Sequence, residues 1–357
     1  MQRRQCLAAL GGLAAALPAV GLQAAVLPAG PTKSASSALS ASSTSERREL
    51  MGTQVDLHVA AVPPALAREA MDAAWQRMAA LAAQMSRFEA GNPLSQLAAE
   101  AGRGQVLTVS PELGAVLAAA RQRASDTQGL YDPTVGSYRG WDFRPGQQRE
   151  AGEAEIREQR RLRGWQHLQL DASGRRAMLD RAGVQLDLGG AAKLPILEAG
   201  LQVLRAHGVE HALINGGGDV LTLGRAAPDR AWRVALRDPR QPQRWLGVLD
   251  MPARGAVLAA SGDYERGFDA AGRHCHHILD PRTGQPTQGL HGLALLAERV
   301  ADVNAWGPAM MVGGAAQARR WARGLQGVEL MLAGPGEGQG REELWMSSGL
   351  TSALRRA

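Results

Sequence analysis

Apolar and polar residues alternate between positions 51 and 61, which predicts a first β-strand. From position 63 to about position 85 the spacing of apolar residues becomes helical. The residues expected to form the buried face of this helix are Leu66, Met71, Trp75, Met78 and Leu81. A second helix is expected from Pro111 to about Ala124, because Ser110 is a good N-cap residue and proline is favoured at the first helical position.

Helical and extended patterns then continue without regular alternation. Residues 185–190 indicate the end of a short strand, and residues 192–207 indicate a helix. Extended segments follow at 211–223, 232–236 and 245–251, the first of them divided by a turn at three consecutive glycines, 216–218. Two late helices are expected near 302–312 and 315–325. Strands and helices mixed in this order favour an α+β fold over a doubly wound parallel sheet.

The first 46 residues differ from the rest in composition. Residues 1–25 contain Arg3-Arg4 followed by a stretch rich in Ala, Leu and Gly, which predicts a signal peptide of the twin-arginine type and export to the periplasm. An uncleaved membrane anchor is the alternative, which Pro18 and the glycines disfavour. Residues 26–46, rich in Ser and Ala, predict a flexible linker, so residues 47–357 form the expected folded domain. No membrane span is expected after processing.

Composition changes this picture only slightly. The 357 residues are 45% hydrophobic and 21% charged, which is typical of a globular protein large enough for one or two domains. The net charge of +6 invites a nucleic-acid interpretation, but the arginines are scattered and no binding motif accompanies them. We therefore expect no nucleic-acid partner. Removal of the leader would leave Cys275 without a second cysteine, so no internal disulfide is expected.

Candidate chemistry is densest between Ser261 and Pro286. A Ser261-Gly262-Asp263 turn precedes a cluster that contains three of the eight histidines, His274, His276 and His277. Two simpler interpretations exist, a plain hairpin with turn residues or an adventitious metal-binding tract. Neither explains the polar turn at this spacing, so we interpret the segment as a site.

A second candidate is the glycine-containing turn from Asp187 to Lys193. Glycines at the start of a helix let backbone N–H groups approach a phosphate, although a plain tight turn explains the same residues. Lys193 strengthens the phosphate interpretation. It is one of only two lysines among 40 basic residues, and the other, Lys33, falls in the linker. A compact point charge could be needed there, with chance as the alternative.

Three weaker signals complete the set. Tyr131 and Phe88 would serve as stacking surfaces for a flat ligand, while Asp132-Pro133 is also ordinary turn chemistry. Asp219 follows the glycine turn at 216–218 and could contribute to a site or simply end that turn. Asp302 begins a late helix, where it would be a cap or, if it faced a phosphate-binding turn, a ligand of Mg²⁺.

Taken in order, these segments resemble the FAD:protein FMN transferase family of the ApbE type. The resemblance runs from Met51 to about Gly349. Its motifs here are Met51-Gly-Thr53, Ser86-Arg-Phe88, Thr127-Gln-Gly-Leu-Tyr-Asp-Pro-Thr134, Asp187-Leu-Gly-Gly-Ala-Ala-Lys193, Gly216-Gly-Gly-Asp219, Ser261-Gly-Asp-Tyr264, His277-Ile-Leu-Asp-Pro-Arg-Thr-Gly284 and Ala301-Asp302. The resemblance implies an ApbE-type, T-fold-like α+β fold, with mixed sheets, packed helices and an FAD cleft.

The resemblance also implies an activity, in which the FMN moiety of FAD passes to a threonine of an acceptor flavoprotein and AMP is released. The acceptor would be a periplasmic or membrane-bound redox subunit. Residues implied to bind FAD are Met51, Phe88, Leu130, Tyr131, Asp132, Gly189, Lys193 and Ile278. His277 is implied to be catalytic with support from Asp263, and Asp302 and the carbonyl of Ala192 to hold Mg²⁺. The alternatives are a non-catalytic periplasmic FAD-binding protein and an FAD pyrophosphatase.

The chain departs from the family pattern in three places. Leu194-Pro195 stands where the family has a glycine and an aromatic residue, and Gln96 stands where it has a glutamate. Trp306 occupies the position, four residues after Asp302, of a threonine that ligates the metal. Tryptophan cannot ligate Mg²⁺, and Asn304 could replace the threonine only if the start of the helix were remodelled. These departures predict a changed metal site within a retained fold.

Overall fold

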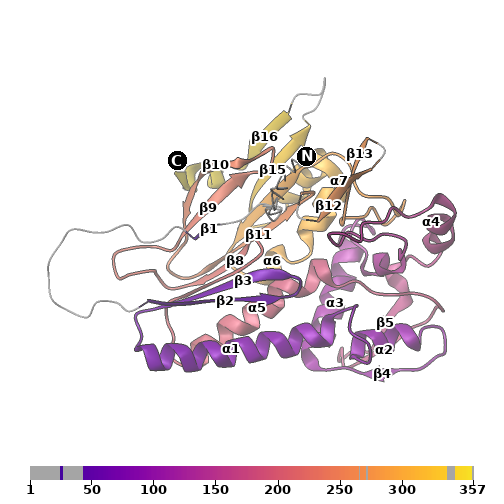
Figure 1. Cartoon of the computed structure of the whole chain (residues 1–357), viewed down its shortest axis with the longest axis horizontal. Helices are drawn as coiled ribbons and strands as arrows, with labels where there is room; N and C mark the ends of the chain where they lie inside the picture. Colours follow the sequence, from indigo (N-terminus) through magenta and orange to yellow (C-terminus); the bar gives the residue numbers. More distant parts are fainter. Residues whose placement is uncertain (1–24, 27–42, 265, 271, 336–341, 356–357) are drawn as a thin grey trace, which may run out of the picture.

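A computed structural model gives the fold of residues 25–26, 43–264, 266–270, 272–335 and 342–355 (Figure 1). Almost all of the predicted signal peptide, 1–25, and most of the predicted linker, 26–46, lie outside these described residues. Within them, no helix is long and apolar enough to cross a membrane.

The centre of the fold is an eight-stranded sheet. Its strands, in spatial order, are β16 (Glu342–Met346), β15 (Glu329–Pro335), β14 (Gly292–Ala297), β11 (Ala256–Gly262), β8 (Asp219–Leu223), β7 (Ala212–Gly216), β3 (Thr53–Ala60) and β2 (Ser43–Leu50). Neighbouring strands pair antiparallel throughout. The predicted turn at the three glycines joins β7 to β8, and Gly217 and Gly218 adopt the positive φ values that glycine permits.

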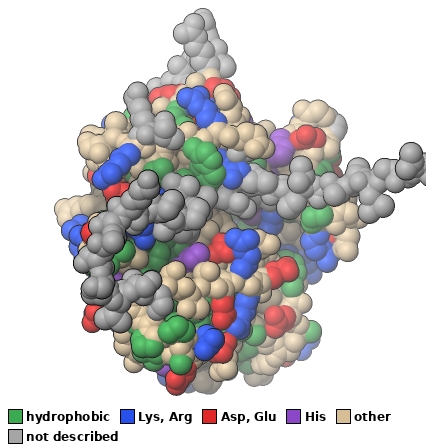
Figure 2. All heavy atoms as spheres, turned by 60° about the vertical axis from the view of Figure 1, so that its left-hand side comes forward, with side chains coloured by type: hydrophobic (Ala, Val, Ile, Leu, Met, Phe, Trp, Pro, Cys, Tyr) green, Lys and Arg blue, Asp and Glu red, His purple; other side chains and the backbone are tan. Residues whose placement is uncertain are grey.

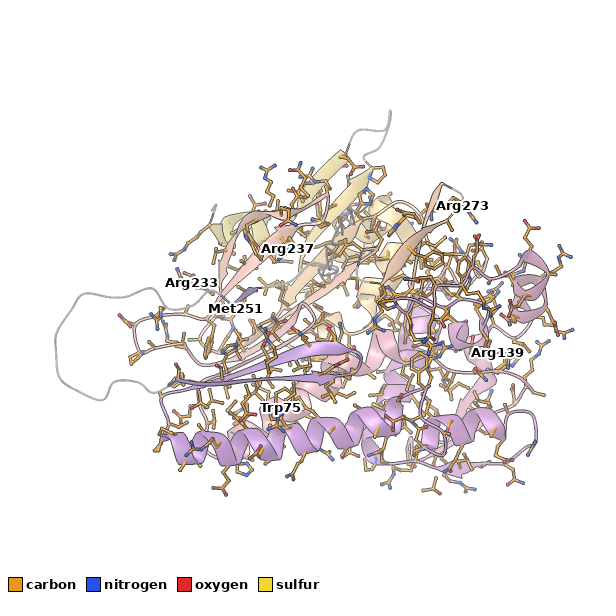
Figure 3. The ribbon with its side chains drawn as sticks, in the orientation of Figure 1. Trp75, Arg139, Arg233, Arg237, Met251 and Arg273 are labelled. Carbon is orange, nitrogen blue, oxygen red and sulfur yellow. The ribbon has the colours of Figure 1, made fainter. Side chains whose placement is uncertain are left out.

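Helices cover one face of this sheet. They are α1 (Pro64–Met85), α5 (Gly189–Ala206), α6 (Val300–Val303) and α7 (Trp306–Ala322). The predicted buried face of α1 is confirmed for Met71, Trp75, Met78 and Leu81, while Leu66 is only partly buried. Trp75 reaches from α1 towards the β2–β3 pair, where its indole N–H donates to Glu46 at 2.9 Å (Figure 3).

Strands rather than helices cover the opposite face. β9 (Arg233–Asp238) and β10 (Gln241–Asp250) form a smaller sheet with β1 (Ala25–Val26) and β17 (Leu354–Arg355), beside α8 (Ser348–Ala353). β14 shows how the central sheet serves both cores. Leu293 and Leu295 face the helices, whereas Ala294 packs with the β9–β10 layer. The alternation expected of a strand thus buries both faces of the sheet.

A peripheral segment, residues 86–188, packs beside the helices (Figure 1). It contains α2 (Pro93–Ala99), β4 (Leu107–Thr108), α3 (Pro111–Asp126), η1 (Pro133–Ser137), α4 (Glu153–Arg160), η2 (Trp165–His167), β5 (Leu168–Leu170) and β6 (Arg176–Leu179). The Ser110 cap of α3 is confirmed, because its hydroxyl accepts a hydrogen bond from Leu113 N. A hairpin of β12 (Gly267–Ala270) and β13 (Arg273–His276) packs against this segment through Cys275.

The α+β class is confirmed, with two local corrections. Residues 185–188 do not form the predicted strand end, since Asp187 N donates to Pro133 O in the peripheral segment, and α5 begins at Gly189. The predicted division between the two late helices is confirmed at Gly314, whose φ of 74° interrupts α7. A second break was not predicted, because Ala305 adopts a left-handed φ of 61° that separates α6 from α7. Single residues with positive φ end a helical turn without any change in hydrophobic spacing.

His291 links three strands, β11, β14 and β16, at one end of the central sheet. It precedes β14, and its ring hydrogen-bonds to Asp263, after β11, at 3.0 Å and to Glu342, at the start of β16, at 3.2 Å. These contacts, led by the hydrogen bond with Asp263, raise the pKa of His291 to about 9 against the opposing effect of partial burial. The protonated ring thus bridges two carboxylates from different strands.

This bridge predicts a pH dependence of stability. Because the pKa of His291 in the folded state exceeds the usual 6.5, its stabilisation is fully present below pH 6.5 and is lost as the pH rises through about 9. We expect the Tm of the wild type to fall across that window, and to fall less in His291→Gln. Thermal unfolding between pH 6 and 10 measures both curves, and parallel curves for the two proteins would contradict the assignment.

Candidate active site

The turn between β2 and β3 meets the β12–β13 hairpin at the first element of the site. The Arg266 guanidinium donates through Nη2 to the carbonyls of Met51 and Gly52, at 3.3 and 3.0 Å. The carbonyl of Arg266 in turn accepts a hydrogen bond from the backbone N–H of His277 at 3.0 Å. Met51, Arg266 and His277, which are far apart in the sequence, are therefore held together by backbone contacts.

His277 is held as a neutral base. Its side chain remains exposed to solvent although protein surrounds it on most sides. The low polarity of those surroundings, followed by the positive charges of Arg266 and Lys193, lowers the pKa of the His277 imidazole far below its usual range. A neutral imidazole at physiological pH can accept a proton from a reacting hydroxyl group.

Lys193 reaches the same region from the second turn of α5. Its ammonium lies 2.9 Å from Asp219 Oδ2, and Asp219 is almost fully buried at the start of β8. The other carboxylate oxygen of Asp219 accepts a hydrogen bond from Ala260 N on β11 at 2.8 Å. The cation is thereby fixed by two strands of the sheet. Of the two interpretations of Asp219, a contribution to the site is the one that this contact supports.

The three clustered histidines have separate surroundings. Buried His276 lies 2.8 Å from the carbonyl of Thr287, and burial lowers the pKa of His276. His274 lies between Asp269 Oδ1, at 2.7 Å, and the carbonyl of Asp263, at 3.1 Å. Among the residues that the structure describes, no group of three His, Cys, Asp or Glu side chains is arranged to hold a metal ion.

Asp263 does not contact His277 through a hydrogen bond. Its carboxylate pairs with His291, and its backbone N–H donates to the carbonyl of the same residue at 3.0 Å. The predicted support of His277 by Asp263 therefore has no direct hydrogen bond behind it in this structure. Asp263 instead fixes the end of β11, from which the chain leads into the β12–β13 hairpin.

The loop after α3 supplies the predicted flavin-binding residues of the peripheral segment. Tyr131 is buried, its hydroxyl has no hydrogen-bond partner within the described part of the chain, and burial raises the pKa of that hydroxyl. The ring packs against the start of α5, where a side chain at Gly190 would come within 3.2 Å of Tyr131 and 2.9 Å of Pro308. Leu130 is partly buried beside it. An orphaned buried hydroxyl next to a side-chain-free helix start fits a polar ligand.

The remaining predicted flavin-binding residues differ in accessibility. The Asp132 carboxylate is buried and accepts hydrogen bonds from Thr134 and from Trp165 N of η2, so protein groups already satisfy it. Ile278 is buried next to His276, and Gly189 begins α5. Phe88 is 78% exposed and lies beneath the guanidinium of Arg87, which pairs with Asp187 at 2.9 Å. That ion pair places Phe88 near the start of α5.

The predicted metal ligands do not fit a magnesium ion. Mg²⁺ requires several oxygen ligands in octahedral geometry. Both carboxylate oxygens of Asp302 accept hydrogen bonds from Arg299, at 3.0 and 2.6 Å, and Trp306 is buried without offering an oxygen. Asn304 turns its amide nitrogen, a hydrogen-bond donor, towards the carbonyl next to Ala192. In this arrangement Asp302 and Asn304 are hydrogen-bonded to other protein groups, and the residues do not form a metal site.

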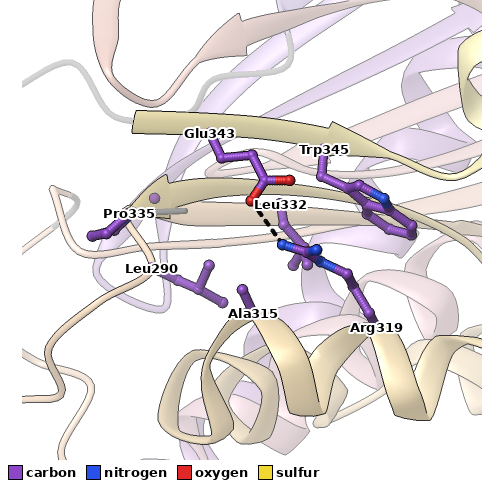
Figure 4. Close-up of a pocket in the computed structure, with 8 residues that line it drawn as sticks. Leu290, Ala315, Arg319, Leu332, Pro335, Glu343 and Trp345 are labelled. Atoms are coloured by element: carbon purple, nitrogen blue, oxygen red, sulfur yellow. Dashed lines mark hydrogen bonds and ion pairs between the residues drawn. The ribbon is translucent and has the colours of Figure 1, made fainter. Parts of the chain in front are cut away.

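Two cavities of the described part of the chain lie beside α7. One of about 530 Å³ is lined by Leu130 and Trp306 together with Asp126, Thr127, Gln128, Gln317, Arg320, Trp321, Gly324 and Leu325. The other, of about 10 Å³, lies between α7 and strands β15 and β16, beside the Arg319–Glu343 ion pair (Figure 4). The smaller cavity holds at most one water molecule, so it cannot accept a flavin.

Arg266 is the site residue that sequence reasoning passed over. It is one arginine among many, and its partners Met51 and Gly52 are more than 200 positions away in the chain. The signal that could have identified it is its position, three residues after Asp263 in the polar turn that opens the histidine segment.

Comparison with known proteins identifies the family and the fold of this chain. The model of the ApbE family matches residues 51–332. A FAD:protein FMN transferase of Rhodobacter capsulatus is 33% identical over 273 residues, which cover 76% of this chain and 51% of that protein. One from Escherichia coli is 24% identical, covering 76% of this chain and 75% of that protein. The chain thus spans about half the length of its Rhodobacter relative.

Solved structures agree as well. The ApbE protein of Thermotoga maritima superposes with a TM-score of 0.77 at 26% identity, over 88% of this chain and all of that one. The flavin transferase ApbE of Vibrio cholerae gives a TM-score of 0.74 at 22% identity over 88% of this chain and shows the same fold. The family match extends from the Met51 turn past the start of α7 and includes every element that carries the site. The chain belongs to the ApbE family.

Proposed function

We propose that this protein transfers the FMN moiety of FAD to a threonine hydroxyl of an acceptor flavoprotein and releases AMP. The observation that supports this most strongly is the meeting of a fixed cation, Lys193, with a neutral base, His277, beside the start of α5. Lys193 is close enough to His277 for its charge to help lower the pKa of the imidazole. The relatives named as FAD:protein FMN transferases support the same reaction.

The site offers groups that suit FAD. The backbone N–H groups at the start of α5, beginning with Gly189, and the Lys193 ammonium would receive the diphosphate. Gly190 leaves space at this point, because any side chain there would press on Tyr131 and Pro308. The Tyr131 hydroxyl would gain a hydrogen-bond partner from the bound flavin. Met51, Leu130, Ile278 and the exposed ring of Phe88 would supply apolar contacts.

The reaction can be balanced with these residues. The threonine oxygen attacks the phosphorus on the FMN side of the diphosphate, and the new P–O bond forms as the bond to the AMP phosphate breaks. His277 takes the hydroxyl proton, and AMP leaves with the electron pair of the broken bond. Lys193 and the start of α5 offset the charge that develops on the phosphate oxygens. Asp263 acts indirectly, because its ion pair with His291 fixes the start of the segment that leads to His277.

The location and the partner are further parts of this proposal. The paired arginines of the leader support export by the twin-arginine route, and an exported enzyme would modify a periplasmic or membrane-bound redox subunit. Basic and acidic side chains are interspersed on the face shown in Figure 2, which suits a protein partner better than a polyanion. No step of the reaction is assigned to Mg²⁺, because Ala192 and Asp302 are not arranged to hold it.

Replacing the base gives the first test of this function. We expect His277→Gln to lower the rate of FMN transfer by about 10²- to 10⁴-fold, with FAD affinity nearly unchanged, because the hydroxyl proton loses its acceptor. In-gel flavin fluorescence of a threonine-bearing acceptor measures the rate. His274→Gln is the matched control, since His274 lies in the same cluster but is bonded to Asp269, and it should transfer normally.

The pH profile of the wild type adds a second readout to that test. Because the pKa of His277 is lowered, the imidazole stays neutral as the pH falls through 6.5, so the transfer rate should not decline there. A decline centred near pH 6.5 would contradict the proposed state of His277. Free FMN and AMP without a labelled acceptor would indicate a pyrophosphatase, and unchanged bound FAD a binding protein.

Removing the cation tests phosphate binding. Lys193→Met should weaken FAD binding by about 10- to 100-fold, because a charge-assisted contact with the diphosphate is lost. That variant also leaves the buried carboxylate of Asp219 without its partner, which could weaken FAD binding by destabilising the fold. The double variant Lys193→Met/Asp219→Asn removes this charge as well, so a loss of FAD affinity that persists in it comes from the missing cation. Calorimetric titration with FAD should show the same weakening in both proteins. Unchanged affinity in the double variant would exclude Lys193 as a phosphate ligand.

A further inference from the structure

Two of the departures of this chain from its family, Pro195 and Trp306, lie with Asn304 at one junction, where the first turn of α5 touches the break between α6 and α7. Pro195 lies in α5, Asn304 ends α6, and Trp306 begins α7. The contact that joins them is a hydrogen bond of 2.9 Å from the Asn304 side-chain amide to the backbone carbonyl of Ala191. Both Asn304 and Ala191 are buried.

Pro195 explains why this carbonyl needs an outside donor. In an α-helix the carbonyl of residue 191 accepts the N–H of residue 195, and proline has none. A buried carbonyl without a donor destabilises the fold, so a partner must come from elsewhere. The Asn304 amide is that partner. Two residues 109 positions apart in the chain are therefore coupled through a single carbonyl oxygen.

Asn304 is itself held from two sides. Its backbone N–H closes α6 on the carbonyl of Val300 at 2.9 Å, and its own carbonyl accepts from Arg123 Nε on α3 at 3.2 Å. The Arg123 guanidinium lies over the Trp306 ring, 4.1 Å from the ring centroid. The left-handed Ala305 lies between Asn304 and Trp306 and separates α6 from α7. The amide is thus fixed in place, with its donor aimed at α5.

We propose that the Asn304–Ala191 hydrogen bond joins α5 to the α6–α7 junction in place of a divalent cation, and that this chain binds its flavin diphosphate without Mg²⁺. The part of this inference that concerns the flavin rests on the proposed function. The part that concerns the Asn304–Ala191 hydrogen bond does not. The Asn304 amide donates to the Ala191 carbonyl, next to the Ala192 carbonyl implied as a ligand, and it turns towards this turn of α5 an N–H group, which cannot ligate a cation. The Asp302 carboxylate, bonded to Arg299 through both oxygens, is likewise engaged elsewhere.

The positive charge that a cation would bring has other sources here. Lys193 keeps Asp219 at 2.9 Å, and an ammonium has three donors, so it can contact a phosphate at the same time. Arg266 donates to Met51 and Gly52 through one nitrogen of its guanidinium, which carries five N–H donors in all. The start of α5 adds a favourable field for an anion.

A double-mutant cycle on the apoprotein tests the junction. Asn304→Ala should lower the Tm by about 3 °C, because the Ala191 carbonyl loses its donor. In a Pro195→Ala background the same change should lower it by less than about 1 °C, since residue 195 then has an N–H of its own to offer. Equal losses in the two backgrounds would overturn the coupling. If Asn304→Ala does not fold alone, recovery of folding in the double variant gives the supporting result.

Titration with FAD tests the metal independence. In 1 mM EDTA and in 5 mM MgCl₂ the Kd for FAD should agree within about twofold, and MgCl₂ alone should not raise the Tm of the apoprotein. If Mg²⁺ tightens FAD binding tenfold or more, and Asp302→Ala removes that effect, the proposal is wrong. Absence of FAD binding under both conditions would refute the proposed function instead. The double-mutant cycle and the Tm of the apoprotein in MgCl₂ would then still test whether the Asn304–Ala191 hydrogen bond stands in place of a cation.

Discussion

The ion pair of Lys193 with Asp219 is the contact on which the site depends. Asp219 is almost fully buried, and a buried carboxylate is strongly destabilising unless a charge and hydrogen bonds compensate it. Lys193 supplies the charge from α5, and Ala260 N supplies a hydrogen bond from β11. The Asp219 carboxylate therefore ties α5 to β8 and β11 of the central sheet. A shift of the start of α5 would separate Lys193 from Asp219 and leave a buried carboxylate without its counter-charge, which is strongly destabilising.

The two-sided burial of the central sheet explains where chemistry can occur. Strand residues alternate between the helical core and the β9–β10 core, so neither face is open to a ligand. Only strand ends and turns remain, and the site uses them. Met51 lies in the β2–β3 turn, Asp219 begins β8, and Asp263 follows β11. Because these strands are antiparallel neighbours within one sheet, these three positions fall at the same end of it.

Sequence reasoning succeeded where the signal is local. The α1 face follows from the spacing of Met71, Trp75, Met78 and Leu81, and the start of α3 follows from Ser110 with Pro111, because neighbours within one helical turn determine both. It failed at Asp187, where a hydrogen bond to Pro133, 54 positions earlier, replaces strand pairing. Hydrophobic spacing contains no information about such a distant partner.

The site shows the same division. The motifs identified Lys193 and His277 individually, but not Arg266, whose importance comes from contacts with a turn more than 200 residues away. The histidine cluster was interpreted as one feature, yet strand geometry separates it. His274 and His276, two positions apart on β13, stack on one another at 5.9 Å, while His277 follows the end of the strand. Adjacent letters in a sequence are therefore a weak guide to shared chemistry.

The metal position shows how departures at separate points can be one physical change. Considered singly, Trp306 looks like the loss of a ligand, Pro195 like a defect in a helix, and Asn304 like a poor substitute for threonine. In the fold, Pro195 removes the donor that the Ala191 carbonyl would have had, and Asn304 restores one across the junction. Arg123 then fixes the backbone of Asn304 and covers Trp306. A hydrogen bond needs no counter-charge, whereas a bound cation does. Asp302 can therefore stay paired with Arg299, and under the proposed function Lys193 and Arg266 would offset the charge of the diphosphate.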